Sequence, residues 1–195
     1  MQLVNAWFYR QMAIWSTIFK RDDMALEYWG RVRALRPRDA RPVAAIAHLH
    51  AAQGRRGAAI QCMAQALAIE PGQADGWFNL GFLQQEEGEH AAAITSFERA
   101  LAINEKLDRA FYGKALSLIK LEQVEAAIAP LQKNTELQPM SPYGWYQLAH
   151  VYHRLGDAER VAKTIRRLAQ FEPAVARQLE GETGVSVGVR LLSDR

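Results

Sequence analysis

The chain has 195 residues, of which 49% are hydrophobic and 23% are charged, and its formal net charge is +3. The hydrophobic content can fill a core, the charged fraction is ordinary for a soluble protein, and so small a charge does not require a nucleic acid or a membrane as partner. The single cysteine, Cys62, excludes an internal disulfide and favours a reducing compartment, so we predict a cytoplasmic location.

The first twenty residues, MQLVNAWFYRQMAIWSTIFK, do not resemble a secretory signal. No basic segment precedes the apolar part, which Asn5, Arg10 and Gln11 interrupt, and no small-residue cleavage site follows. No apolar run reaches the roughly eighteen residues that a membrane-spanning helix needs. We therefore expect neither a leader peptide nor a membrane span.

The predicted elements are helix pairs that recur every 34 residues. Prolines keep this step at Pro37, Pro71, Pro139 and Pro173, with Glu105 in the remaining place. Glycines keep it at Gly54, Gly88 and Gly156, with Glu122 in the remaining place. Small apolar residues keep it at Ala25, Ala59, Ala93, Ala127 and Val161. A fixed period of this length predicts a repeat architecture, with repeats at 6–39, 40–73, 74–107, 108–141 and 142–175.

Repeat one departs from the pattern, because its predicted turn at residues 20–23 has no glycine. Its first helix is unusually apolar and contains Trp7, Phe8, Met12, Ile14, Trp15, Ile18 and Phe19. In one interpretation, several of these side chains pack against repeat two. In the other, an exposed group docks onto a partner or a membrane interface, as aromatic-rich amphipathic helices do. The candidate docking residues are Trp7, Ile14, Trp15 and Ile18.

Repeat three shows most clearly why the pattern predicts paired helices. Trp77, Leu80 and Gly81 are spaced to share one face of a first helix, and Ala93 and Phe97 are spaced to share one face of a second. The absence of a side chain at Gly81 lets the two helices approach closely. A helix pair of this size has too little core to be stable alone, so the repeats are expected to stack on one another.

The motif of repeat three resembles the tetratricopeptide repeat (TPR) family, whose pattern has an aromatic residue, Leu-Gly, a later alanine, an aromatic residue, alanine and a closing proline. The matching residues are Trp77, Leu80, Gly81, Ala93, Phe97 and Ala100, with Glu105 where proline is usual. The five repeats cover about nine tenths of the chain. The resemblance implies an all-α fold, a right-handed α-solenoid of helix-turn-helix repeats.

Repeat four is degenerate, since Lys114 takes the usual leucine place and Asn134 the usual alanine place. Pro130 lies inside its second helix, where it should kink or delay the helix. The differences are explained either by tolerated drift, with Lys114 extending its amine to water, or by a local change of superhelical curvature.

The repeats are followed by a tail, residues 176–195, in which we predict a short capping helix that ends near Glu180. Val185, Val187 and Val189 alternate with small residues, a strand-like period. A tail of this kind is expected to be poorly ordered unless something holds it.

The TPR resemblance also implies a binding groove, because the first helices of such arrays line the concave face. Carried onto this sequence, the groove positions include Arg41, Ala44, His48, Asp75, Phe78, Phe82, Glu86, Arg109, Tyr112, Leu116, Tyr143, Tyr146, His150 and Arg154. Aromatic anchors near arginines are typical of binding hot spots. The predicted partner-binding set is Phe78, Phe82, Arg109, Tyr112, Leu116, Tyr143, Tyr146, His150 and Arg154. In the alternative interpretation, about half of these residues pack between repeats.

The carboxylate clamp of chaperone-tail TPR proteins is mostly missing. Asn79 matches its middle asparagine and Arg109 could replace one lysine, but Ala44 and His48 stand where lysine and asparagine are expected. Gly113 replaces the last basic residue. We therefore do not expect this chain to hold a C-terminal carboxylate in that way.

The charge is unevenly distributed. Residues 1–56 hold ten basic and four acidic side chains, whereas residues 57–107 hold two and seven. The basic part is either a solvated face or a patch that attracts an acidic partner or anionic lipid headgroups. The arginines do not alternate with aromatic residues, which disfavours a nucleic acid partner.

We predict no enzyme activity, cofactor or metal. His150 and His153 are three residues apart and could share a metal, but a pair alone does not make a site. Cys62 is expected to be a small buried apolar residue, and no phosphate-binding loop or nucleophile motif occurs.

The leading hypothesis is a bacterial-style adaptor that holds a segment of another protein in its groove. The second is a structural or assembly subunit of a larger, membrane-associated complex, docked through the apolar first helix and the tail. A third is a secretion-type chaperone, but such chaperones usually have about three repeats and are acidic, whereas this chain is mildly basic.

Overall fold

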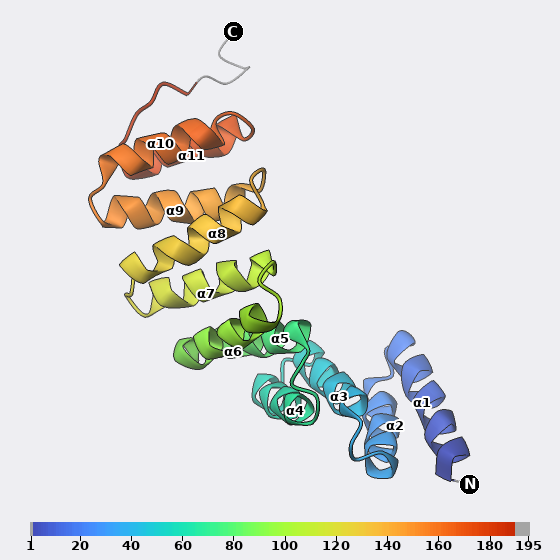
Figure 1. Ribbon diagram of the computed structural model, residues 1–195. Helices are drawn as coiled ribbons and strands as arrows, with labels where there is room; N and C mark the ends of the chain where they lie inside the picture. Colours follow the sequence, from blue (N-terminus) through green and yellow to red (C-terminus); the bar gives the residue numbers. More distant parts are fainter. Residues whose placement is uncertain (1, 190–195) are drawn as a thin grey trace. The chain divides into compact units, whose positions relative to one another are not determined.

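The computed structural model describes the backbone of residues 2–189 and the side chains of residues 4–189. Within this part of the chain there are eleven α-helices and no strand, so the all-α fold is confirmed (Figure 1). The helices belong to two compact units, Met1–Ile103 and Asn104–Arg195. We call them the N-terminal and C-terminal units and describe each by itself.

The N-terminal unit consists of three helix pairs (Figure 1). The helices are α1 (Gln2–Ile18), α2 (Asp22–Leu35), α3 (Ala40–Ala52), α4 (Arg56–Ile69), α5 (Ala74–Glu86) and α6 (His90–Ile103). Each helix packs against the next along the chain. α1, α3 and α5 are therefore the first helices of the pairs, and α2, α4 and α6 are the second.

Small residues at the predicted positions let these helices approach closely. Ala25, Ala59 and Ala93, which recur on the 34-residue step, have no solvent-exposed surface. Gly81 of α5 lies against the ring of Phe97 of α6, and Phe97 is fully buried. The core thus forms where the sequence period places alanine and glycine.

A hydrophobic cluster continues from one pair to the next. It is formed by Ala47 of α3, Met63 and Leu67 of α4, and Leu80 of α5, with Trp77 packed at its edge. Burial of such side chains contributes about 1.5–3 kcal/mol each for the larger ones. The α3–α4 pair is therefore stabilised by α5, as expected for repeats that must stack.

The turns inside the pairs need a left-handed backbone. Gly54 and Gly88 have φ angles of 72° and 83°. Lys20 occupies the same place in the first pair with a φ of 54°, although it carries a side chain. The turn without glycine in repeat one therefore keeps the conformation of the others, at a cost in backbone strain.

The C-terminal unit contains the remaining helices (Figure 1). They are α7 (Asp108–Lys120), a 3-10 turn (Glu125–Ala127), α8 (Ile128–Leu137), α9 (Pro142–Arg154), α10 (Ala158–Leu168) and α11 (Pro173–Thr183). Each α-helix packs against the next, and α11 also packs against α9.

Pro130 explains why α8 is short. The 3-10 turn occupies the place where an α-helical turn would begin, and α8 starts at Ile128, so Pro130 is its third residue. A proline is tolerated in the first turn, where its missing amide hydrogen is not needed. The structure therefore shows the delayed start of the α-helix that the sequence predicted.

Asn134 has a structural role that its degenerate position did not indicate. It is buried, and its Nδ2 donates a hydrogen bond to the carbonyl oxygen of Asp108, 3.0 Å away, at the start of α7. This bond joins the second helix of the pair to the beginning of the first. Asparagine at the usual alanine position therefore makes a specific polar contact, so drift alone does not explain the substitution.

The capping helix and the tail differ from the expectation. α11 reaches Thr183, three residues beyond the predicted end at Glu180, and stops at Gly184, whose φ is 71°. Val185, Val187 and Val189 form no strand, because no second strand is present in residues 2–189 to pair with them. Residues 190–195 of the predicted tail lie outside the described part of the chain.

The Glu180 side chain holds the described part of the tail. Its Oε1 accepts hydrogen bonds from the backbone amides of Val187 and Gly188, the latter at 2.8 Å. Arg177 donates a bond of 2.9 Å to the carbonyl oxygen of Val189. The segment after α11 is thus folded back onto that helix by two of its own charged side chains.

Candidate functional site

A hollow of about 240 Å³ in the N-terminal unit is lined by the first helices α3 and α5 and also by Met63, Ala66 and Leu67 of the second helix α4. Its rim includes Arg41, Ala44 and His48 from α3, together with Asp75 and Asn79 from α5. Four of these five residues are groove positions carried over from the TPR pattern. The face on which the sequence places a groove is therefore hollowed in this unit.

A second hollow, of about 720 Å³, lies between α1 and α3. Ile14 and Ile18 of α1 line it on one side, and His48 and Leu49 of α3 on the other, with Trp29 of α2 also contributing. His48 lines both hollows, so they are adjacent along the first-helix face. Ile14 and Ile18, predicted as docking residues, are part of this groove.

Two aromatic residues of α5 lie on the same helix as the rim of the smaller hollow. Phe78 is half-buried, with its ring centroid 5.8 Å from that of Phe97. Phe82 stacks on Phe78 at 6.5 Å and leaves 48% of its surface exposed. Of the two predicted anchors, Phe82 is thus the one available to a partner, whereas Phe78 supports it from the core.

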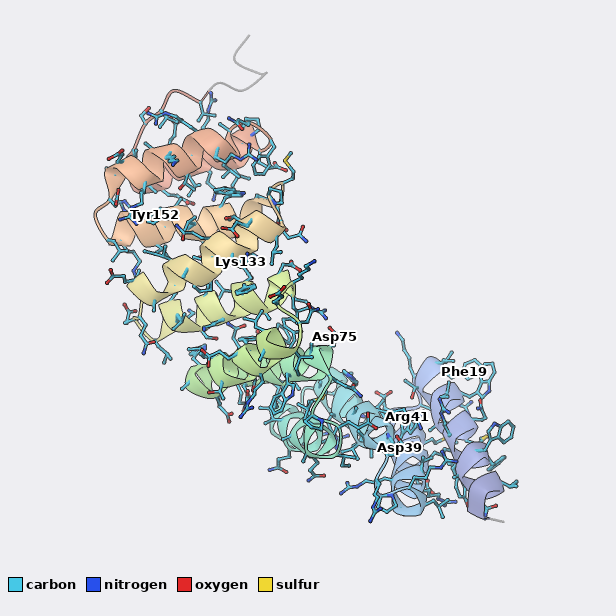
Figure 2. All side chains as sticks on the ribbon, viewed as in Figure 1. Phe19, Asp39, Arg41, Asp75, Lys133 and Tyr152 are labelled. Carbon is cyan, nitrogen blue, oxygen red and sulfur yellow. The ribbon has the colours of Figure 1, made fainter. Side chains whose placement is uncertain are left out.

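Charged residues surround this face in specific pairs. Arg41 donates to Asp39 over distances of 2.7 and 2.8 Å, at the start of α3 (Figure 2). These hydrogen bonds hold the pKa of the Asp39 carboxyl below its usual value. Arg56 of α4 lies 3.7 Å from Glu86, the groove position at the end of α5. The surroundings of the smaller hollow, whose own lining includes Arg41, Glu70 and Asp75, therefore carry both signs of charge rather than one.

The corresponding face of the C-terminal unit is partly covered by α11. Tyr146 of α9 donates a hydrogen bond of 2.9 Å to Oε2 of Glu182, and Nε2 of His150 lies 3.0 Å from the same oxygen. The bond to Glu182 raises the pKa of the Tyr146 hydroxyl. The structure thus brings Tyr146 and His150 together and gives them a partner inside the chain, Glu182, while their role in partner binding stays a prediction.

The other predicted residues of this unit are in varied positions. Tyr112 is half-buried, and this burial raises the pKa of its hydroxyl although it also hydrogen-bonds to Gln147. Tyr143 is 69% exposed, Leu116 is half-buried, and Arg109 is exposed. Arg154 forms an ion pair with Glu122. Tyr143 is therefore the aromatic side chain that this face offers most fully to solvent.

The first helix exposes a large apolar surface. Trp7 and Trp15, two of the predicted docking residues, are 60% and 54% exposed. Ile18 is also exposed, whereas Ile14 is half-buried. Most of the large apolar side chains of this helix are thus exposed, with Met12 and Ile14 half-buried, and docking of the exposed group onto a partner stays a prediction.

Chemical groups for a metal are sparse in the described residues, which contain no cluster of three or more histidine, cysteine, aspartate or glutamate side chains suited to an ion. Cys62 is half-buried, rather than buried as expected, and this partial burial raises the pKa of its thiol. Among residues 2–189, no helix combines the length and apolarity required to cross a bilayer.

Some residues of these faces were not found from the sequence. Trp29 and Ala45 line the larger hollow, and Glu182 closes the Tyr146–His150 cluster. Trp29 lies on a second helix, where the TPR pattern places core residues rather than groove residues. Glu182 lies in the tail, outside the five repeats, so the period contains no signal for it.

Comparison with known proteins agrees with this architecture. Models of the family described as "Tetratricopeptide repeat" match residues 40–73, 74–107 and 142–174, which together are just over half of the chain. Protein FlbA of Caulobacter vibrioides is 26% identical over 107 residues, 55% of this chain. The match spans only 18% of FlbA, so most of that protein has no counterpart here.

Solved structures show the same fold at low sequence identity. A crystal structure of MamA superposes with a TM-score of 0.79 at 17% identity and covers 96% of this chain and 98% of MamA. YrrB, described as a TPR protein with an unusual peptide-binding site, superposes with a TM-score of 0.77 at 16% identity, over 89% of this chain and 90% of YrrB. With the repeat motif, the helix pairs and the family matches in agreement, the chain belongs to the tetratricopeptide repeat family.

Proposed function

We propose that this protein is a non-catalytic adaptor that binds a segment of another protein on the face formed by its first helices. The TPR fold generally mediates protein–protein interactions, and YrrB is described as binding a peptide. The observation that carries the proposal is the pair of adjacent hollows that share His48 on the first-helix face of the N-terminal unit. The proposed location is cytoplasmic.

The chemistry of the hollows defines the segment that would fit them. The larger hollow is lined by Ile14, Ile18, Leu49 and Trp29, so it suits an apolar side chain of the partner. The smaller hollow has Arg41, His48 and Asp75 on its rim but is also lined by Ala44, Met63 and Leu67, so it suits a group with an apolar part and a polar or charged end. An extended segment or an amphipathic helix can present both kinds of group.

Phe82 adds an anchor beside this surface. Exposed aromatic side chains contribute strongly to interfaces because they bury a large area with few rotatable bonds. Tyr143 is the equivalent candidate in the C-terminal unit. We assign partner contact to Phe82 and Tyr143. Tyr146 and His150 contact the partner as well, after the partner has displaced Glu182 from them or has bound beside Glu182.

Affinity capture from the native source tests the proposal, with Phe82→Asp compared against the wild-type chain. Phe82 is exposed, so its replacement should leave the fold intact while it removes the anchor. The matched control is Leu121→Asp, since Leu121 is an exposed apolar side chain that follows α7 and is not a groove position. Loss of one captured protein with Phe82→Asp but not with Leu121→Asp supports groove binding. Equal capture by both variants argues against it.

A second candidate function is favoured by the exposed aromatic surface of α1. In that case the protein is a structural subunit of a larger, membrane-associated assembly, anchored by α1 rather than by the groove. The same multi-subunit assembly should then be captured by the wild type and by Phe82→Asp, and it should be lost when Trp15 is replaced by serine.

A further inference from the structure

The first helix α9 of the C-terminal unit presents a row of aromatic and polar side chains. The row follows the i, i+3, i+7 and i+11 spacing of a single helix face and consists of Tyr143, Tyr146, His150 and Arg154. Tyr143 is 69% exposed, whereas Tyr146 and His150 are half-buried and pack ring against ring with centroids 4.6 Å apart. We call these four residues the α9 row. It begins with an exposed ring and continues with groups that can donate hydrogen bonds.

Two carboxylates of the chain itself occupy the donors of the α9 row. Oε2 of Glu182, on the neighbouring helix α11, lies 2.9 Å from the Tyr146 hydroxyl and 3.0 Å from Nε2 of His150 (Figure 1). Glu122, in the turn after α7, forms an ion pair with Arg154 at the end of α9. The α9 row therefore holds carboxylates at two successive places along the helix.

The Glu182 carboxylate is accessible, and α11 has other contacts that hold it in place. The side chains of Glu182 and His150 are 34% and 31% exposed, so a partner can reach the contact between them. Leu179 of α11 is fully buried, and its packing does not depend on the carboxylate. Hydrogen bonds from Gln178, and then from Tyr146 and His150, lower the pKa of Glu182, so the group is ionised at neutral pH. A carboxylate from another chain can therefore replace it while α11 stays packed.

Glu122 occupies its position at a cost in backbone strain. Its φ is 60°, in the turn position that Gly54, Gly88 and Gly156 occupy in three other helix pairs. The Glu122 side chain is 77% exposed, so burial does not explain why glutamate stands where glycine would be unstrained. Strained positions concentrate at functional sites. The interaction that glutamate adds here is the ion pair with Arg154.

The charges of the first helices in this unit favour an acidic occupant. α7 and α9 hold one acidic side chain, Asp108, and four basic ones, which are Arg109, Lys114, Lys120 and Arg154. The excess of +3 is balanced by three glutamates outside these helices, which are Glu122, Glu125 and Glu182. Two of the three are the carboxylates that the α9 row holds. Acidic groups of a partner therefore suit this surface where they replace those two glutamates rather than add to them.

We propose that the α9 row binds an acidic segment of a partner protein, in which an apolar side chain covers Tyr143 and two aspartate or glutamate residues take the places of Glu182 and Glu122. The inference rests on the proposed binding of a protein segment by the first helices, and it names the chemistry of that segment in the C-terminal unit. The two glutamates of the chain act as internal competitors, because the partner must displace both of them.

The spacing along α9 defines the order of groups in the segment. The apolar residue comes first, the carboxylate held by Tyr146 and His150 second, and the carboxylate held by Arg154 third. At about 1.5 Å per helical residue, successive places are roughly 7–9 Å apart. An extended segment covers that distance in about two or three residues.

Selection from a displayed library of random peptides tests the proposal on the full chain. The wild type should enrich peptides in which two acidic residues follow an apolar one. Glu122→Gln/Glu182→Gln should bind the same synthetic peptides about three- to tenfold more tightly, since each exposed ion pair that the peptide must replace is weak. Glu159→Gln is the matched control, because Glu159 is an exposed glutamate on the second helix α10, and it should bind them like the wild type.

Variants of the α9 row locate the bound peptide. Arg154→Gln and Tyr146→Phe/His150→Ala should each weaken binding of the acidic peptides about tenfold, because hydrogen bonds to a charged group are lost. Selected peptides without acidic enrichment would overturn the proposal. So would acidic peptides whose binding is lost with Phe82→Asp but kept by both α9 variants, although that result would support groove binding in the N-terminal unit. Failure of every form to select any peptide would contradict groove binding as well.

Glu122→Gly separates competition from any loss of folding. Glycine removes the backbone strain, so the midpoint of thermal unfolding should rise, while the loss of the carboxylate should tighten binding of the acidic peptides. Unchanged peptide binding by this variant would overturn the role of Glu122 as a competitor. Molar mass in solution identifies a rival occupant. A dimer that dissociates on Tyr143→Ser would show that a second copy of the chain covers the α9 row, and it would overturn the proposal.

Discussion

The ring of Phe97 occupies the space that a β-carbon on Gly81 would need. A β-carbon at Gly81 would lie 2.8 Å from Cε1 of Phe97 and 3.2 Å from the carbonyl oxygen of Ala93. Real β-carbons essentially never approach as closely as the first of these distances. The contact between α5 and α6 therefore depends on glycine at this position, for packing rather than for backbone freedom.

Gly81→Ala should destabilise the protein. The added methyl group overpacks a buried contact, which typically costs about 1–3 kcal/mol and outweighs the higher helix propensity of alanine. Urea denaturation followed by circular dichroism measures the change. Gly30→Ala is the control, since Gly30 lies inside α2 with no atom within 4 Å of an added β-carbon, and it should raise stability. Equal effects of the two substitutions would show that the Phe97 contact is not tight.

Lys20→Gly should stabilise the protein. Lys20 has a φ of 54° at the turn position that Gly54 and Gly88 occupy in the next two pairs. A left-handed backbone costs a residue with a side chain about 1–2 kcal/mol, which glycine avoids. The midpoint of thermal unfolding should rise by a few degrees. The converse change, Gly88→Lys, should lower it, and a neutral result for both would contradict the strain.

Asn134 and Gly144 should be energetically coupled. Asn134→Ala removes the hydrogen bond to the Asp108 carbonyl and should cost about 1–3 kcal/mol. Gly144→Ala places a methyl group against the Asn134 side-chain oxygen and should also destabilise. Alanine at 134 makes room for that methyl group, so the double variant should cost less than the two single changes together. Strict additivity in a double-mutant cycle would contradict the contact.

The tail should detach from α11 in acid. Partial burial raises the pKa of Glu180, but hydrogen bonds from the amides of Val187, Val189 and Gly188 outweigh this and lower it. The stabilisation that follows from a lowered carboxyl pKa is fully present above the ordinary value of about 4.3 and is lost as pH falls through the lowered value.

Hydrogen exchange of the Val187 and Gly188 amides measures this loss, with rates corrected for the intrinsic effect of pH. Protection should fall in acid, and Glu180→Ala should abolish it at neutral pH. Glu159→Ala, a change of an exposed glutamate on α10, should leave it unchanged. Protection that persists in Glu180→Ala would show that another group holds the tail.

The sequence predicted the repeating part of this fold because close packing requires small residues at fixed intervals. Ala25, Ala59, Ala93, Ala127 and Val161 were found by their spacing, and all are fully buried. Glycines found by the same spacing have the left-handed backbone that their turns need. These features depend on the immediate neighbours along the helix pair, so their signals are local and periodic.

The sequence could not predict contacts that depend on how the last helix packs. Tyr146 and His150 are separated from Glu182 by more than thirty residues, and α11 is not part of a complete repeat. The strand-like alternation of Val185, Val187 and Val189 was misleading, because a strand needs a partner. The amides of Val187 and Val189 donate to the Glu180 carboxylate instead, and that of Val185 donates to the Thr183 hydroxyl. Non-periodic side-chain contacts of this kind leave no pattern to detect.

Site-directed photo-crosslinking tests groove binding most directly. A photoreactive phenylalanine analogue is placed at His48 or Phe82 on the first-helix face, or at Ala102, an exposed position on the second helix α6, and cells of the native source are irradiated. Groove binding predicts that His48 and Phe82 crosslink to the same partner protein and that Ala102 does not. Crosslinks to a partner from Ala102, with none from His48 or Phe82, would contradict it.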